Sequence, residues 1–404
     1  VASAAVALVF VNWALFRMTR FPPGPLLVIL GIILTAAGSV MPDMFLDAII
    51  LATPILLGTI LFGCGLRINL ISISRNTKSA MFSFLTLVLT ISVICGFSVL
   101  VLGMNLQEAV VVGAMGTVVC SFFVSRTVMA LNIAPRVANS LVLEGPITEA
   151  VSILVALVAI GEITTDVPML QGVVFGGLFG LLIGMVWVRL VQFTSDFPYK
   201  NSLTLSLGLG LIAFCEMVFP NSGFVSALFF GLSLGNANLL KTKIDLSGLM
   251  KFQGDIVMVM GTFFFFYLGL SGAANGFNIG YLFIGGAIWA MGAIVRGLTT
   301  YISLRGEGFN LPIMGIATKG VSVVLIGQVA LINNMDISDV LFSFAIPLVF
   351  LGGILTGVCS LISEGKRAGG VEEITYLKVT KNAGHIKHAY DIEEMKKTIE
   401  KEII

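Results

Sequence analysis

Apolar residues in this chain come in long continuous runs that short polar stretches separate. An α-helix of about twenty apolar residues crosses the hydrocarbon core of a bilayer, so each run of roughly that length predicts one transmembrane helix. We count thirteen such spans, at residues 1–16, 25–41, 45–66, 79–104, 107–130, 137–161, 167–194, 201–219, 221–238, 250–275, 279–303, 309–333 and 337–362. The pattern therefore predicts an all-α polytopic membrane protein with a polar tail after the last span.

The composition supports a membrane protein and excludes several other classes. Hydrophobic residues make up 57% of the chain, charged residues only 11%, and the mean hydropathy is +1.03, which no soluble globular protein requires. A formal net charge of +1 gives no electrostatic support for nucleic-acid binding. The five cysteines form no CxxC pair, and neither an HExxH motif nor paired catalytic aspartates occur, so we expect neither an enzyme nor a resident cofactor.

Basic residues in the short loops predict the orientation of the chain in the membrane. They follow every odd-numbered span up to the eleventh, as Arg17, Arg20, Arg67, Arg75, Lys78, Arg136, Lys200, Lys241, Lys243, Lys251 and Arg305. The alternate loops carry acidic residues instead, namely Asp43, Asp47, Glu162, Asp166, Asp336 and Asp339. Because basic loops stay in the cytoplasm, we expect a cell-membrane protein with its N-terminus outside and its tail in the cytoplasm.

The spacing of the spans predicts an internal repeat. Residues 1–161 and 201–362 each hold six spans and have nearly equal lengths, and a linker helix at 162–200 separates them. Two six-span halves offset in this way are inverted, and such repeats place a substrate site near the midplane on interrupted helices. Spans five and twelve occupy matching positions, and both are unusually polar and rich in glycine. We therefore expect two broken helices there, and a cytoplasmic tail at 363–404.

Two acidic residues, Glu144 and Glu149, lie inside the sixth span and are separated by Gly-Pro-Ile-Thr. A carboxylate in hydrocarbon costs about 3 kcal/mol on insertion scales, and an ionisable residue there is a functional candidate by default. Pro146 removes a backbone donor and weakens the helix between the two acids. The segment therefore predicts a transport role for at least one acid, and a structural ion pair is the alternative for the other.

Depth along the spans separates the roles of these two acids. At 1.5 Å per residue, Glu144 lies about 10 Å from the cytoplasmic end of span six, and Arg296 lies at about the same depth in span eleven, which predicts an ion pair. Glu149 lies close to the midplane, at the depth of Cys120 in span five and Lys319 in span twelve. We therefore expect Glu149 to face the broken helices without a permanent partner.

These features resemble the monovalent cation:proton antiporters, and specifically their NhaP/NHE-type sodium/proton exchanger branch. The resemblance covers the whole membrane part, with its thirteen spans and inverted repeat. The family's acid-Ser-x-x-Asn-Asp-Ala element in span six is matched by residues 144–150, and its span-eleven arginine by Arg296. Its Gly-x-x-basic-Gly element in span twelve is matched by a longer version, residues 315–320, with Lys319 as the basic residue. The resemblance implies an NhaA-like antiporter fold with crossed broken helices, and a homodimer in the lipid bilayer.

The chain departs from the family pattern at the ion site. The family's span-five aspartate lies twenty-four residues before the first acid, where this chain has Cys120 followed by Ser121. The family's Asn-Asp pair is Thr148-Glu149 here. The resemblance implies an ion site formed by Glu149, Thr148, Cys120 and Ser121, with the monovalent cation on the Glu149 carboxylate and hydroxyl oxygens from Thr148 and Ser121.

The expected function is secondary active transport, in which protons exchange for Na+ by competition at Glu149 with alternating access. A proton and a cation can each neutralise the carboxylate but not together, so a single unpaired acid predicts electroneutral exchange. K+ is the alternative cation, because serine-rich span-five segments also occur in the potassium-efflux branch. Two other classes stay open: a cation channel or uniporter on the same fold, which would lack saturable proton-linked flux, and a membrane sensor that has lost transport.

Overall fold

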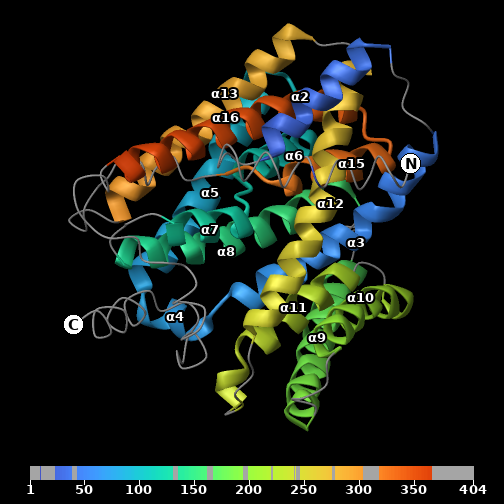
Figure 1. The fold of residues 1–404 in the computed structure, drawn as a ribbon, viewed down its shortest axis with the longest axis vertical. Coiled ribbons are helices and arrows are strands. Elements are labelled where there is room, and N and C mark those ends of the chain that lie inside the picture. The colour runs from blue at the N-terminus through green and yellow to red at the C-terminus, as the bar shows by residue number, and fades with distance from the viewer. Residues whose placement is uncertain are drawn as a thin grey trace.

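The computed structural model describes residue 10 and residues 23–38, 43–130, 135–161, 167–193, 199–219, 222–240, 242, 246–274, 278–303 and 318–365. All regular secondary structure in this part of the chain is helical (Figure 1). The helices are α2 (Pro23–Ala36), α3 (Asp43–Arg67), α4 (Leu70–Arg75), α5 (Thr77–Leu100), α6 (Leu106–Thr117), α7 (Ser121–Ala130), α8 (Pro135–Ile160), α9 (Val167–Phe193), α10 (Lys200–Val218), α11 (Gly223–Gly235), η1 (Ala237–Leu240), α12 (Ser247–Ala274), α13 (Ile279–Ser303), α15 (Val321–Ile332) and α16 (Ser338–Gly365).

The helices agree with the predicted spans. Within the described residues, nine helices are long and apolar enough to cross a membrane, and three shorter apolar helices cover 24–36, 223–235 and 321–332. Each of the predicted spans from the second to the thirteenth coincides, in whole or in part, with a described helix or pair of helices. The first predicted span, at 1–16, lies outside the described residues except for residue 10, and so does nearly all of the predicted tail. The chain is a multi-pass helical membrane protein.

Span five is interrupted, as its glycine and polar content predicts, and the described part of span twelve begins with a non-helical stretch. In span five, α6 ends at Thr117 and α7 begins at Ser121, so residues 118–120 are not helical. In span twelve, residues 318–320 are not helical ahead of α15, and residues 309–317 lie outside the described part of the chain. The backbone N–H of Cys120 donates to the carbonyl of Thr318 at 2.9 Å, so the two breaks meet. The prediction of crossed broken helices is therefore confirmed.

Glycine is required where the two breaks meet. A Cβ atom at Gly320 would lie 2.5 Å from the Cβ of Cys120, closer than side chains approach one another in folded proteins. Gly145 plays a similar part in α8, because a Cβ there would lie 3.0 Å from the Cα of Ser121. The absence of these side chains lets α8 and both broken helices come together at one place.

Two hydrophobic cores hold the helices around this crossing. The larger core draws buried residues from α2, α3, α5, α6, α8, α12, α13, α15 and α16. The smaller core lies between α3, α9, α10 and α11, where Phe62 stacks on Phe230 with ring centroids 5.6 Å apart. Figure 1 shows α3 and α12 running between α5–α8 on one side and α9–α11 on the other. The long helices α3 and α12 therefore separate two groups of helices.

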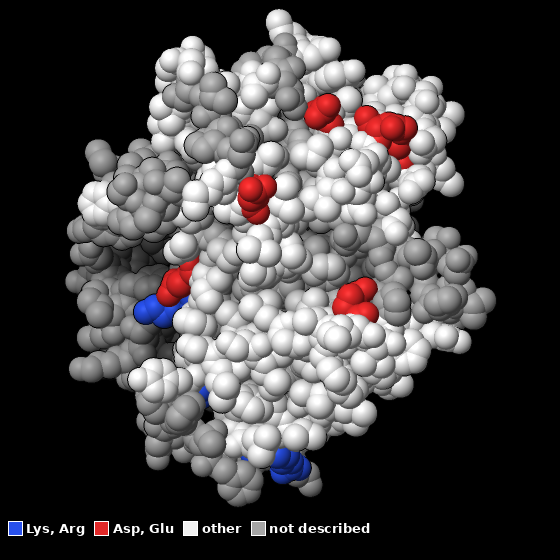
Figure 2. All heavy atoms as spheres, turned by 90° about the vertical axis from the view of Figure 1, so that its right-hand side faces the viewer, with Lys and Arg blue, Asp and Glu red and all other residues white. Residues whose placement is uncertain are grey.

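The outer surface fits contact with lipid. Figure 2 shows one face on which Lys, Arg, Asp and Glu are sparse and other residues cover most of the described area. Helices at the periphery present large apolar side chains outward, such as Leu178 and Leu182 of α9 and Phe283 and Ile294 of α13. In water this exposure would be unfavourable, whereas lipid chains solvate it.

Candidate functional site

The Glu149 carboxylate lies at the crossing of the broken helices. Its side chain comes from the middle of α8, and the residue is 2% exposed. Oε2 accepts a hydrogen bond from the backbone N–H of Ser121 at 3.0 Å, and Oε1 accepts one from the hydroxyl of Ser322 at 2.6 Å. The thiol of Cys64 also approaches Oε2, at 3.5 Å. Three other helices, α7, α15 and α3, therefore each contribute one contact to this carboxylate.

Two helix N-termini meet at this acid. Ser121 is the first residue of α7, and Ser322 is the second residue of α15. The first N–H groups of a helix have no partner within the helix and carry a partial positive charge, which stabilises an adjacent carboxylate. Within the described residues, no lysine or arginine forms an ion pair with Glu149. The carboxylate is therefore held by neutral donors, which leaves it able to take up a proton or a small cation.

Lys319 occupies the opposite end of the break in span five. The residue is 7% exposed. Its ammonium group donates to the carbonyl of Gly116 at 2.5 Å and to that of Val118 at 2.8 Å. These carbonyls belong to the C-terminal end of α6, which has unpaired acceptors and a partial negative charge. The broken helix thus has a cation at the end where α6 stops and an anion, Glu149, where α7 starts.

Glu144 and Arg296 form the ion pair that their equal depths predict. Arg296 Nη1 lies 2.7 Å from Glu144 Oε1, and both side chains are buried, at 3% and 0% exposed. The pair joins α8 to α13 across the interior. A buried pair costs desolvation on both sides, and removing one partner leaves an uncompensated charge. Its position away from the Glu149 contacts fits a structural role.

The remaining predicted site residues lie nearby but contribute unevenly. Ser121 contacts Glu149 through its backbone N–H, and Cys120 contributes its backbone to the crossing. The hydroxyl of Thr148 donates within α8, to the carbonyls of Glu144 at 2.8 Å and Gly145 at 3.1 Å. This bond supports α8 as it continues through Pro146. The donor of Thr148 is thus used inside its own helix.

Two contacts of Glu149 were not expected from the sequence. Ser322 carried a usable signal, because it follows the predicted break in span twelve by two residues and so begins the second half of a broken helix. Cys64 carried none, since it is one of several cysteines inside apolar runs. Its contact depends on how α3 packs against α8, which the one-dimensional pattern does not encode.

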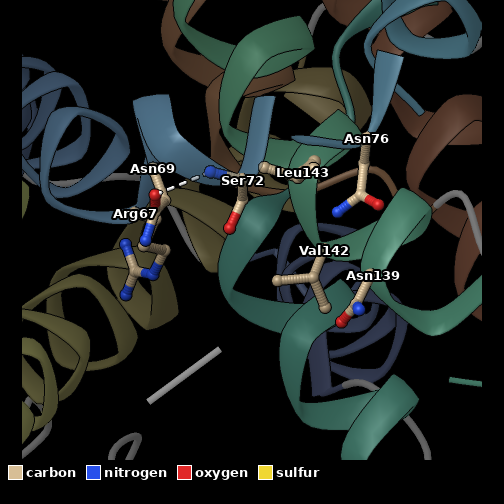
Figure 3. A pocket seen from close by; sticks show the side chains of 7 residues that line it. All are labelled: Arg67, Asn69, Ser72, Asn76, Asn139, Val142 and Leu143. Atoms are coloured by element: carbon tan, nitrogen blue, oxygen red, sulfur yellow. Dashed lines mark hydrogen bonds between the residues drawn. The ribbon is translucent and has the colours of Figure 1, made fainter. Parts of the chain in front are cut away.

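A small polar hollow lies beside α8, towards the N-terminal end of this helix. Its lining combines polar side chains with two apolar residues of α8: Arg67, Asn69, Ser72, Asn76, Asn139, Val142 and Leu143 (Figure 3). Asn69 accepts from the backbone N–H of Ser72 at 2.9 Å and so caps the short helix α4. A second hollow, lined in part by Lys319 and Arg296, lies between α5, α6 and α13.

A buried carboxylate at the meeting point of two broken membrane helices is the arrangement of an ion-coupled secondary transporter. The chain belongs to the sodium/hydrogen exchanger family, since the family model described as "Sodium/hydrogen exchanger, transmembrane" matches residues 4–316. The predicted membership of the cation:proton antiporters is therefore confirmed, and the protein is a proton-coupled cation exchanger. Comparison with curated proteins finds none that matches.

The fold is similar to that of a solved antiporter. One similar structure is the sodium proton antiporter MjNhaP1 from Methanocaldococcus jannaschii at pH 8, with a TM-score of 0.70 and 19% sequence identity over 91% of this chain and 96% of that chain. A second is an electron-microscopy map of the same antiporter, with a TM-score of 0.67 and 19% identity over 91% of this chain and 94% of that chain. At this identity the likeness establishes the antiporter fold and leaves the site to be argued from its own residues.

Proposed function

We propose that Glu149 is the carrier group of this exchanger and that protons compete there with Na+, K+ being the alternative cation. The contact set of this acid carries the proposal: among the described residues, the buried carboxylate is bonded to neutral donors, two at helix N-termini and one the thiol of Cys64. A proton on the carboxylate, or a monovalent cation beside it, neutralises the same single charge. Because one acid carries one charge, the proposed exchange is one-for-one and electroneutral.

The bound cation would be coordinated by oxygen atoms around the crossing. The two carboxylate oxygens of Glu149 and the hydroxyl of Ser322 supply the first of these. The hydroxyls of Ser121 and Thr148 are further candidates, and Cys120 stands where a second acid is expected in the family pattern. Hard monovalent cations prefer oxygen ligands to sulfur, so the proposed site relies on a single formal charge. No resident cofactor is part of the proposal.

Three other charges hold the site in shape. Lys319 bonds the end of α6 and keeps the break in span five open. Glu144 and Arg296 tie α8 to α13, so that the helix carrying Glu149 is fixed to its neighbours. In the proposal these groups stay charged and paired throughout the cycle, and only Glu149 exchanges a proton for a cation.

In the proposed cycle, the group of helices that includes α5–α8 and carries Glu149 moves against the group α9–α11. It uses the predicted inverted repeats, 1–161 and 201–362, with the linker at 162–200, and exposes Glu149 alternately to either face. We place the protein in the cell membrane as a homodimer, with the N-terminus outside and the tail at 363–404 in the cytoplasm. The loop charges support this orientation. Membership of an exchanger family favours exchange over the channel and sensor alternatives.

The test is cation-driven proton flux in proteoliposomes containing the Glu149→Gln variant. Glutamine keeps the size of the side chain but removes the charge for which proton and cation compete. The expected result is loss of exchange, with normal yield and thermal stability of the purified protein. The matched control is Asp255→Asn, the same chemical change at an exposed position on α12, which is expected to leave exchange unchanged. Wild-type flux in Glu149→Gln would overturn the assignment.

A further inference from the structure

Arg67 is a buried cation whose bonds are all to neutral groups. It is the last residue of α3 and is 7% exposed. Its guanidinium donates to the carbonyl of Gly63 at 3.1 Å and to Gln253 Oε1 of α12 at 2.8 Å. Among the residues that the structure describes, no carboxylate lies within ion-pair distance of it. A buried charge without a counter-charge is costly, so its retention calls for an explanation.

A hydrogen-bond chain fixes the direction in which Arg67 points. The amide of Gln253 is itself held, because Nε2 donates to the carbonyl of Thr59 at 3.2 Å. Both acceptors of Arg67 therefore draw its guanidinium back along α3, away from the end of the helix and towards the turn that contains Gly63. This turn also carries Cys64. Arg67 thus reaches deeper into the protein than its place at the helix end suggests.

That turn of α3 is the one that contacts Glu149. The thiol of Cys64 lies 3.5 Å from Glu149 Oε2, and the guanidinium of Arg67 donates to the carbonyl of the neighbouring residue, Gly63, so one turn of α3 borders both charged groups. Figure 3 shows Arg67 on one side of the polar hollow and Val142, Leu143 and Asn139 of α8 on the other. A movement of α8 against α3 during transport would bring the carboxylate and the guanidinium into direct contact.

We propose that Arg67 is the counter-ion of the unloaded carrier, an inference that rests on Glu149 being the carrier group. When Glu149 holds neither a proton nor a cation, its negative charge is attracted to Arg67, and the charge pair holds α8 against α3. A proton or a cation on Glu149 cancels this charge and releases α8. The empty Glu149 carboxylate therefore does not pass from one face of the membrane to the other, and proton movement stays coupled to cation movement.

The proposal has a direct electrical consequence. If the empty carboxylate could return across the membrane, each proton carried one way would move net charge without any cation in exchange. Removing the positive charge of Arg67 should therefore open a proton leak that needs no transported cation. The leak should pass through Glu149 and disappear when that carboxylate is absent.

The experiment measures current across a solid-supported membrane after a pH step in choline chloride, free of Na+ and K+. We expect Arg67→Gln to give a cation-independent proton current about tenfold above the wild type, a ratio that one close charge pair can account for. The variant should still exchange protons for Na+ when Na+ is supplied. Arg67→Lys, which keeps the charge, and Lys78→Gln, an exposed control on the same side, should show no extra current.

A second variant tests the idea without an unsatisfied buried group. Gln253→Glu gives Arg67 a permanent carboxylate partner of the same size, so it should neutralise the cation, keep the fold and produce the same leak. In the double variant Arg67→Gln/Glu149→Gln the leak should vanish. No leak in either Arg67→Gln or Gln253→Glu, or a leak that persists without Glu149, would overturn the proposal. Exchange that survives in Glu149→Gln alone would instead overturn the assignment of the carrier.

Discussion

Glu149 and Lys319 compensate opposite ends of the same broken span: the carboxylate accepts from the first N–H of α7 at 3.0 Å, and the ammonium donates to the last carbonyls of α6. An interrupted helix in hydrocarbon exposes unpaired donors at one new end and unpaired acceptors at the other. A side chain of the matching charge at each end satisfies both. Lys319 makes a permanent bond of this kind, whereas Glu149 meets its donors with a charge that a proton or cation can cancel.

Removing Lys319 should destabilise the protein before it alters selectivity. Lys319→Met leaves the carbonyls of Gly116 and Val118 without the donor that holds them, at a position that is largely buried. We expect a loss of about 3–6 kcal/mol in stability, the sum of two hydrogen bonds to a charged group at about 1.5–3 kcal/mol each, and a lower Tm in detergent. Lys319→Arg should keep most of the wild-type stability. An unchanged Tm for Lys319→Met would contradict this role.

The Glu144–Arg296 pair should behave as a coupled structural unit. Glu144→Gln leaves Arg296 buried without its carboxylate partner and should cost about 3–5 kcal/mol in stability. The double variant Glu144→Gln/Arg296→Met removes both charges and should recover much of that loss. Thermal unfolding of the two single variants and the double variant forms the cycle that measures the coupling. Additive losses would show that the pair is not coupled.

Ser322 should affect cation binding more than protein stability. Its hydroxyl lies 2.6 Å from Glu149 Oε1 and is the proposed oxygen ligand from α15. Ser322→Ala should raise the KM for the cation about tenfold, the size expected for a hydrogen-bonding group next to a charge, with a smaller change in maximal rate. Ser74→Ala on α4, whose hydroxyl is exposed, serves as the control. The same KM in both variants would remove Ser322 from the site.

Even the methyl group of alanine at position 320 should lower the stability of the protein and slow exchange. In Gly320→Ala the new Cβ would lie 2.5 Å from Cys120 Cβ, so the two breaks must separate. We expect a destabilisation of about 1–3 kcal/mol, typical of overpacking, together with slower exchange. Adding Cys120→Gly removes the clashing atoms and should restore the Tm. Failure of this second change to rescue Gly320→Ala would mean that the crossing is not limited by this contact.

Hydropathy, charge and depth predicted much of this architecture because a bilayer constrains each of them separately. Spans must be apolar, so their positions can be predicted from the hydropathy of the sequence. The depths of Glu144 and Arg296 follow from counting residues along each span. The breaks at 118–120 and 318–320 were signalled by glycine and polar residues. The contacts of Cys64 and the inward turn of Arg67 were not, since both depend on how α3 packs against α8 and α12. The sequence predicts Arg67 as a loop residue, whereas in the structure it is buried and bonded to Gly63 and Gln253.

The most direct test of a single shared site is the KM for Na+, measured with purified protein in proteoliposomes as a function of pH. If a proton and a cation compete for Glu149, the KM must rise about tenfold for each unit that pH falls below the protonation range of the site, while the maximal rate at saturating Na+ stays constant. A KM that does not change with pH, with protons affecting only the maximal rate, would show that the proton and the cation bind at different sites.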